Sequence, residues 1–137
     1  MRSFVLLILV GICYSSVMAV MQNVTVTGTA LCHKKRMPNV QVELYERDTL
    51  DPNDLLASTY TNAEGEFKIF GEEDEVGSIQ PFLRISHGCM TSQPNCKRVC
   101  DYDVPAGKIG STYDMTYVPL DIALMIEEID KVSTQQA

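Results

Sequence analysis

Histidine and cysteine, the residue types most able to bind metal or form covalent links, lie close together at two places in this sequence. The residues concerned are Cys32, His33, His87, Cys89, Cys96 and Cys100. They could hold zinc, but their spacing lacks two Cys-x-x-Cys pairs. The chain has five cysteines, and Cys13 lies in an N-terminal segment described below as a signal peptide. The other four favour two disulfides in a secreted chain, and three connectivities are possible.

Neither histidine belongs to a recognisable catalytic set. The chain contains no Gly-x-Ser-x-Gly motif and no glycine loop of the kind that cradles phosphate. His87 is better explained as a hydrogen-bonded structural side chain, because a predicted strand precedes it and a cysteine follows it. We therefore predict no enzymatic activity, and a hydrolase is the least favoured function.

Period-two alternation of apolar side chains predicts the strands that position these residues. Val24, Val26, Ala30 and Cys32 share one face of a strand over residues 22–32, and Gly28 marks a bulge or a close approach. Similar patterns occur at 40–45, 79–86, 97–104 and 113–120. Short strands at this spacing predict an all-β sandwich of two sheets with about seven or eight strands.

Residues 55–71 are predicted to form a β-hairpin that supplies two of these strands. Ser58, Tyr60, Phe67 and Ile69 alternate on either side of the segment 62–65, which reads Asn-Ala-Glu-Gly. Asparagine can hydrogen-bond its own backbone, and glycine can enter the left-handed region, so the segment suits a turn. Beyond the last predicted strand, residues 122–132 fit either a short helix or a strand extension.

The two ends of the chain are expected to lie outside the sandwich. Arg2 precedes an apolar run over residues 4–12, and small residues lead to Ala19, so residues 1–19 have the pattern of a secretory signal peptide. The run is shorter than the roughly 20 apolar residues that span a bilayer, which disfavours a retained anchor. Cys13 leaves with the signal. The sequon at Asn23 predicts a glycan, and residues 133–137 a disordered tail.

Charged residues are predicted to gather at opposite ends of the sandwich. The chain carries a formal net charge of -7, which argues against nucleic-acid binding. Successive loops of an antiparallel sandwich alternate between its poles. A basic pole would then hold Lys34, Lys35, Arg36, Lys97 and Arg98, and an acidic pole Asp48, Asp51, Asp54, Glu72, Glu73, Asp74 and Glu75. The basic pole could meet anionic lipid headgroups or an acidic receptor patch, although ordinary solvated loops are as good an explanation. The acidic loops do not match a known calcium loop.

Five ordered motifs resemble the transthyretin-like family of secreted nematode proteins. They are Val24-x-Val26-x-Gly28-x-x-x-Cys32, Pro38-x-Val40-x-Val42-x-Leu44-Tyr45, Asp51-Pro52-x-Asp54-Leu55-Leu56, Thr61-x-x-x-Gly65-x-Phe67 and His87-x-Cys89. The resemblance covers residues 22 to about 121 and implies a transthyretin-like two-sheet sandwich, extracellular, with no cofactor. We expect the sandwich domain to occupy residues 20–132. The chain lacks the C-terminal Tyr-Arg-Gly-Ser segment of the related 5-hydroxyisourate hydrolases.

Two departures from the family pattern bear on the disulfides. The family often has a large apolar residue where Cys100 stands, and often a cysteine near the C-terminus, which this chain lacks. The simplest account is that Cys100 pairs with Cys32, and that Cys89 pairs with Cys96. The rival pairing joins Cys32 to Cys89, and Cys96 to Cys100.

The resemblance implies a binding protein without naming its ligand. We expect a secreted, non-enzymatic module that recognises a cell-surface component, a lipid headgroup or a receptor, through its loops. The alternative is a carrier of a small hydrophobic ligand or hormone in the channel of a homo-oligomer, by analogy with transthyretin, although a shared fold is weak evidence for function.

Overall fold

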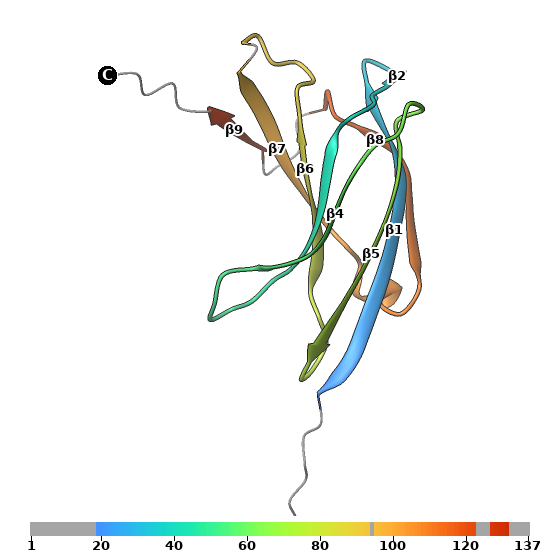
Figure 1. Cartoon of the computed structure of the whole chain (residues 1–137), viewed down its shortest axis with the longest axis vertical. Helices are drawn as coiled ribbons and strands as arrows, with labels where there is room; N and C mark the ends of the chain where they lie inside the picture. Colours follow the sequence, from blue (N-terminus) through green and yellow to red (C-terminus); the bar gives the residue numbers. More distant parts are fainter. Residues whose placement is uncertain (1–18, 94, 123–126, 132–137) are drawn as a thin grey trace, which may run out of the picture.

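The computed structural model is an all-β sandwich of two sheets (Figure 1). It describes residues 19–93, 95–122 and 127–131. The predicted signal peptide up to residue 18 and the tail 133–137 lie outside the described residues. The strands are β1 (Val20–Cys32), β2 (Lys35–Arg36), β3 (Gln41–Glu46), β4 (Asp54–Tyr60), β5 (Glu66–Glu75), β6 (Pro81–His87), β7 (Cys96–Asp103), β8 (Thr112–Pro119) and β9 (Glu127–Lys131), with a 3-10 turn η2 (Ala106–Lys108) before β8.

The strands form two layers with the core between them. Sheet A has the order β2-β1-β5, and β8 also pairs with β1, in parallel. Sheet B has the order β4-β3-β6-β7-β9. The inward faces are those that alternation predicts: Val24, Val26 and Ala30 on β1, and Val42 and Leu44 on β3, are all buried. The all-β sandwich predicted from the sequence is confirmed.

The predicted turn at residues 62–65 is present, but the predicted hairpin is wrong. The Asn62 side-chain oxygen accepts the backbone N–H groups of Glu64 and Glu66, and Gly65 has a φ of 73°. The strands on either side belong to different sheets, because β4 pairs with β3 and β5 pairs with β1.

Anchors at the two ends of this turn explain the separation. The Thr61 hydroxyl accepts the N–H of Val40 at 2.9 Å and donates to the carbonyl of Met37 at 2.8 Å, which ties the end of β4 to β3. The Gly65 carbonyl accepts the N–H of Ala30 at 2.8 Å, which ties the start of β5 to β1. The turn therefore carries the chain from one layer to the other.

Two segments are more regular than the sequence indicates. Residues 72–75, predicted to be an acidic loop, continue β5, because β1 begins early enough to pair Val20 with Glu75. The C-terminal alternative resolves toward strand for residues 127–131, because β9 pairs antiparallel with β7 and no helix forms there. The rest of the predicted helix, at 123–126 and 132, lies outside the described residues.

The predicted disulfide pairing is also wrong. Cys32 bonds to Cys89, with a Cα–Cα distance of 5.8 Å, while Cys96 and Cys100 have free thiols. Cys32 ends β1 and Cys89 follows β6, so both lie at one pole, whereas Cys100 lies further along the sheet, opposite Ile85. The rival pairing is correct only in its first bond. Cys96 and Cys100 are four residues apart in one extended strand, roughly 13 Å, which exceeds the Cα separation a disulfide spans.

Candidate functional site: an open groove and a basic pole

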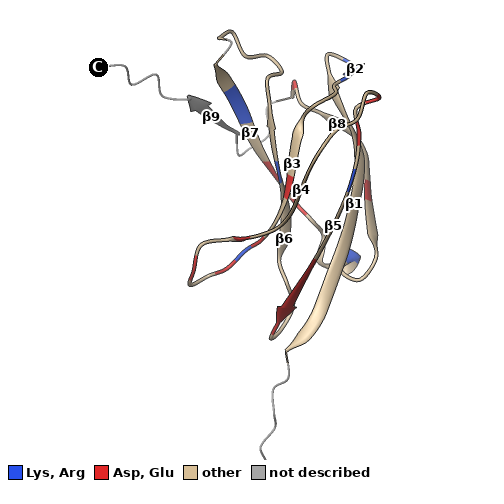
Figure 2. Cartoon of the chain, in the orientation of Figure 1, with Lys and Arg blue, Asp and Glu red and all other residues tan. Residues whose placement is uncertain are grey.

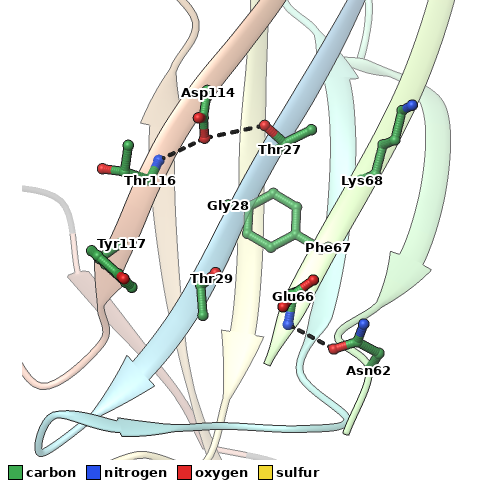
Figure 3. A pocket seen from close by; sticks show the side chains of 10 residues that line it. All are labelled: Thr27, Gly28, Thr29, Asn62, Glu66, Phe67, Lys68, Asp114, Thr116 and Tyr117. Atoms are coloured by element: carbon green, nitrogen blue, oxygen red, sulfur yellow. Dashed lines mark hydrogen bonds between the residues drawn. The ribbon is translucent and has the colours of Figure 1, made fainter. Parts of the chain in front are cut away.

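An open groove runs over the outer face of sheet A (Figure 3). It has a volume of about 540 Å³ and crosses strands β5, β1 and β8. The lining residues are Thr27, Gly28, Thr29, Asn62, Glu66, Phe67, Lys68, Asp114, Thr116 and Tyr117. Most of these side chains are polar, so the groove suits a ligand that makes hydrogen bonds.

A one-residue bulge in β8 shapes one wall of the groove. Thr27 pairs with Asp114 and Thr29 pairs with Tyr117, so three steps along β8 match two steps along β1. Thr116 lies in this bulge and has a left-handed backbone conformation, with a φ of 61°. A bulge reverses the alternation of the strand beyond it. Met115 therefore packs against the core while Tyr117, two residues later, faces outward with 61% of its surface exposed.

Gly28 lies opposite this bulge, and a side chain from the core occupies the space where its Cβ would lie. A Cβ at Gly28 would lie 2.8 Å from Cζ of Phe67. The Phe67 ring thus packs directly against the β1 backbone and forms part of the floor. Of the two alternatives predicted for Gly28, the close approach is present, while the bulge lies on the neighbouring strand β8.

Hydrogen bonds hold the groove side chains in place and leave some polar atoms open. Oδ1 of Asp114 accepts the Thr27 hydroxyl at 3.2 Å and the Thr116 N–H at 2.9 Å (Figure 3). Within the described residues, the second oxygen of Asp114 and the ammonium of Lys68 have no partner. The groove thus offers a fixed acceptor on one wall and a donor on the other.

The predicted basic residues do lie at one pole of the sandwich. Lys34, at a φ of 64°, is in the tight turn between β1 and β2, and Lys35 pairs with Cys32. The disulfide from Cys32 to Cys89 joins this turn to the end of β6, where Arg98 donates to the Cys89 carbonyl at 3.5 Å. Lys97 precedes Arg98 on β7, so the five residues come from two neighbouring segments.

These basic residues differ in how far they are engaged. Arg36 lies 3.4 Å from the Glu66 carboxylate and donates to the Glu64 carbonyl at 3.3 Å. His33 lies 3.9 Å from the carboxylate of Asp121. Lys34 and Lys35 are exposed and make no ion pair within the described part of the chain. They are therefore the two cations of the turn that remain open to a partner.

Acidic residues gather at the opposite pole, as predicted. Figure 2 shows them along the end of β5, with more in the loop between β3 and β4. Glu46, which the sequence analysis did not single out, is 4% exposed there, and burial raises the pKa of its carboxyl above the usual range. The signal was available, because Glu46 continues the inward series of Val42 and Leu44. No cluster of three potential metal ligands occurs among the residues described.

His87 is a buried structural side chain. Its Nδ1 accepts the N–H of Cys89 at 3.1 Å, and its Nε2 lies 3.8 Å from the Cys100 sulfur. Burial, together with the charge of Arg98, lowers the pKa of His87 to about 4. Burial also raises the pKa of the Cys100 thiol. Neither group is accessible to a substrate, which agrees with the structural role predicted for this histidine.

Comparison with known proteins identifies the family. A sequence profile described as the transthyretin-like family matches residues 27–105. The chain belongs to the transthyretin-like family. Transthyretin-like protein 16 of Caenorhabditis elegans is 57% identical over 122 residues, 89% of this chain and 92% of the relative. Transthyretin-like protein 5 of the same nematode is 38% identical over 106 residues, 77% of this chain and 76% of the relative. The resemblance inferred from the five motifs is confirmed.

A likeness among solved structures extends to the fold alone. A 9R-lipoxygenase from Cyanothece superposes with a TM-score of 0.50 at 20% identity, covering 71% of this transthyretin-like chain and 16% of the lipoxygenase. In the described part of the transthyretin-like chain, no helix has the length and hydropathy needed to cross a bilayer.

Proposed function

We propose that this transthyretin-like protein is a secreted, non-enzymatic binding module that docks to an anionic cell-surface component through its basic pole. The observation that supports this most is the exposure of Lys34 and Lys35 on a braced turn. The disulfide at Cys32 and the contacts of Arg36 hold that turn in place, so little order has to be gained on binding.

The proposed interaction is electrostatic and modest per residue. A basic side chain near an anionic membrane contributes about 1 kcal/mol, and salt screens this attraction over roughly 8–10 Å. Acidic groups at the opposite pole would orient the molecule with its basic end toward the partner. The partner would be a lipid headgroup or an acidic patch on a receptor.

Charge reversal separates this proposal from simple solvation of a loop. We would compare Lys34→Glu with Lys35→Glu in one chain against Lys108→Glu, an exposed lysine of η2 at the other pole. The assay is cosedimentation with vesicles of phosphatidylcholine alone or mixed with phosphatidylserine, and binding to intact nematode cells. The double variant should lose binding that the Lys108 variant keeps.

The two assays distinguish the partners. Loss of binding to phosphatidylserine vesicles indicates a lipid headgroup, and loss of binding to cells without vesicle binding by the wild type indicates a receptor. Unchanged binding of the double variant in both assays would overturn the proposal.

The carrier alternative has no specific support among the described residues. A channel for a hydrophobic ligand needs an apolar lining, because burying charged groups without partners is costly. The groove on sheet A instead presents Glu66, Lys68 and Asp114. We therefore do not propose a hydrophobic ligand.

A further inference from the structure

The groove on sheet A differs in chemistry from the basic pole. It carries two carboxylates, Glu66 and Asp114, and one lysine, Lys68, and the Glu66 carboxylate lies 3.4 Å from the Arg36 guanidinium. The remaining charges, on Asp114 and Lys68, balance each other, so the groove has no net charge to attract the anionic partner expected at the basic pole. Charged walls likewise disfavour an apolar ligand.

The groove presents both hydrogen-bond donors and hydrogen-bond acceptors to a ligand. The second oxygen of Asp114 can accept hydrogen bonds on the β8 wall, and the ammonium of Lys68 can donate on the β5 wall. The Nδ2 amide of Asn62 adds a donor at the end of the groove, since its oxygen is already engaged with Glu64 and Glu66. A ligand carrying many hydroxyl groups can satisfy both kinds, because each hydroxyl is a donor and an acceptor.

Tyr117 adds a flat apolar surface beside these groups. Its ring is largely exposed, and the bulge at Thr116 turns it outward onto the groove face (Figure 3). An aromatic ring next to polar groups can cover the C–H face of a sugar ring while its hydroxyl makes a hydrogen bond. The apolar and polar parts of the groove thus match the two faces of a pyranose.

From this arrangement we propose that the groove binds a neutral oligosaccharide, with a sugar ring against Tyr117 and hydroxyl groups on Asp114 and Lys68. The open ends of the groove across three strands leave room for a short chain rather than a single enclosed sugar. This goes beyond docking at the basic pole and does not depend on it.

Two variants test the proposal without disturbing the fold. Asp114→Asn keeps an oxygen for the Thr27 hydroxyl and the Thr116 N–H but replaces the free acceptor with a donor. Tyr117→Ala removes the ring. The matched control is Tyr60→Ala, because Tyr60 on β4 of sheet B is 59% exposed and lies outside the groove.

The experiment is isothermal titration of the disulfide-bonded protein with chitotriose, cellotriose and maltotriose as probes, each up to about 10 mM. We expect saturable binding of at least one probe, weakened about tenfold by each groove variant and unchanged by Tyr60→Ala. Lys34→Glu with Lys35→Glu should leave sugar binding intact, which separates this result from the proposed docking function.

Three results would overturn the proposal. They are no saturable binding of any probe, binding that survives both groove variants, and binding of a sulfated trisaccharide or of spermidine in place of the neutral sugars. The last outcome would mean that charge, and not the pattern of donors and acceptors, selects the ligand.

Discussion

The outer faces of both sheets carry aromatic and charged side chains, but the aromatic rings differ in their exposure to solvent. On sheet B, Phe82 faces outward yet is 0% exposed, because Tyr45 stacks on it at 5.4 Å and the Arg47 guanidinium covers it at 4.4 Å. Arg84 covers both rings. On sheet A, Tyr117 stays open.

The charges of the two faces differ in the same way. Arg84 makes two hydrogen bonds of 2.9 Å to Asp101, and Arg47 lies 2.7 Å from Asp103. These two arginines of sheet B are therefore paired with carboxylates, whereas Lys68 on sheet A has no partner among the residues described. The difference teaches that aromatic and charged residues on an outer face can cover one another, as on sheet B, or stay exposed where a bulge changes their spacing, as at Tyr117 on sheet A.

Removing Phe82 should produce the largest effect. Phe82→Ala should lower the free energy of unfolding by about 3–5 kcal/mol, as for other buried phenylalanines. Urea denaturation measures this loss, and Phe70→Ala on the exposed outer face of β5 is the control, expected to cost less than about 1 kcal/mol. Equal losses for the two variants would break the comparison.

The stability of the protein should depend on pH through His87, which is buried at the end of β6 in sheet B. Its pKa is about 4 when folded and 6.5 when unfolded, so the unfolded chain binds more protons between these values. Stability should therefore fall as the pH drops from 6.5 to 4, by about 1.4 kcal/mol per pH unit at most.

His87→Asn isolates this contribution, because asparagine can still accept the N–H of Cys89. The stability of the variant should change less over this pH range. Glu46 acts with the opposite sign, since burial raises the pKa of its carboxyl, and it is present in both proteins. An identical pH profile for the two would contradict the prediction.

Adding a Cβ at Gly28 should have an intermediate effect on stability. Gly28→Ala places a Cβ 2.8 Å from the Phe67 ring and should destabilise the protein by about 1–3 kcal/mol. Gly107→Ala is the matched control, because a Cβ there meets nothing within 4 Å. Thermal denaturation of both variants shows whether the groove floor is as tightly packed as the distance indicates.

Removing Tyr117 should have the smallest effect on stability. Tyr117→Ala should change the free energy of unfolding by less than about 0.5 kcal/mol, because its ring is mostly in solvent. Chemical denaturation alongside Phe82→Ala measures the contrast directly. A loss above about 2 kcal/mol would show that Tyr117 is packed in the manner of Phe82.

Much of the fold follows from the sequence because alternation and turn chemistry are local. The inward faces of β1 and β3 and the turn at Asn62 and Gly65 all depend on neighbouring residues. The layer to which each strand belongs does not. Thr61 and Gly65 form hydrogen bonds with segments far away in the chain, and Cys32 bonds to a cysteine 57 residues away.

The candidate site was predictable only in part. The basic turn could be read from Lys34 to Arg36, and the position of Lys97 and Arg98 followed from the alternation of loops. The groove could not, because regular alternation in 113–120 would put Tyr117 on the same face as Met115. Only the pairing of β8 with β1 reveals the extra residue that turns Tyr117 outward.

The measurement that tests the central claim most directly is solvent paramagnetic relaxation enhancement of aromatic ring signals by a soluble gadolinium chelate. The account predicts strong broadening of Tyr117, comparable to that of exposed Tyr60, and protection of Phe82. Equal protection of Tyr117 and Phe82, or broadening of Phe82, would contradict the claim that sheet A is open and sheet B is closed.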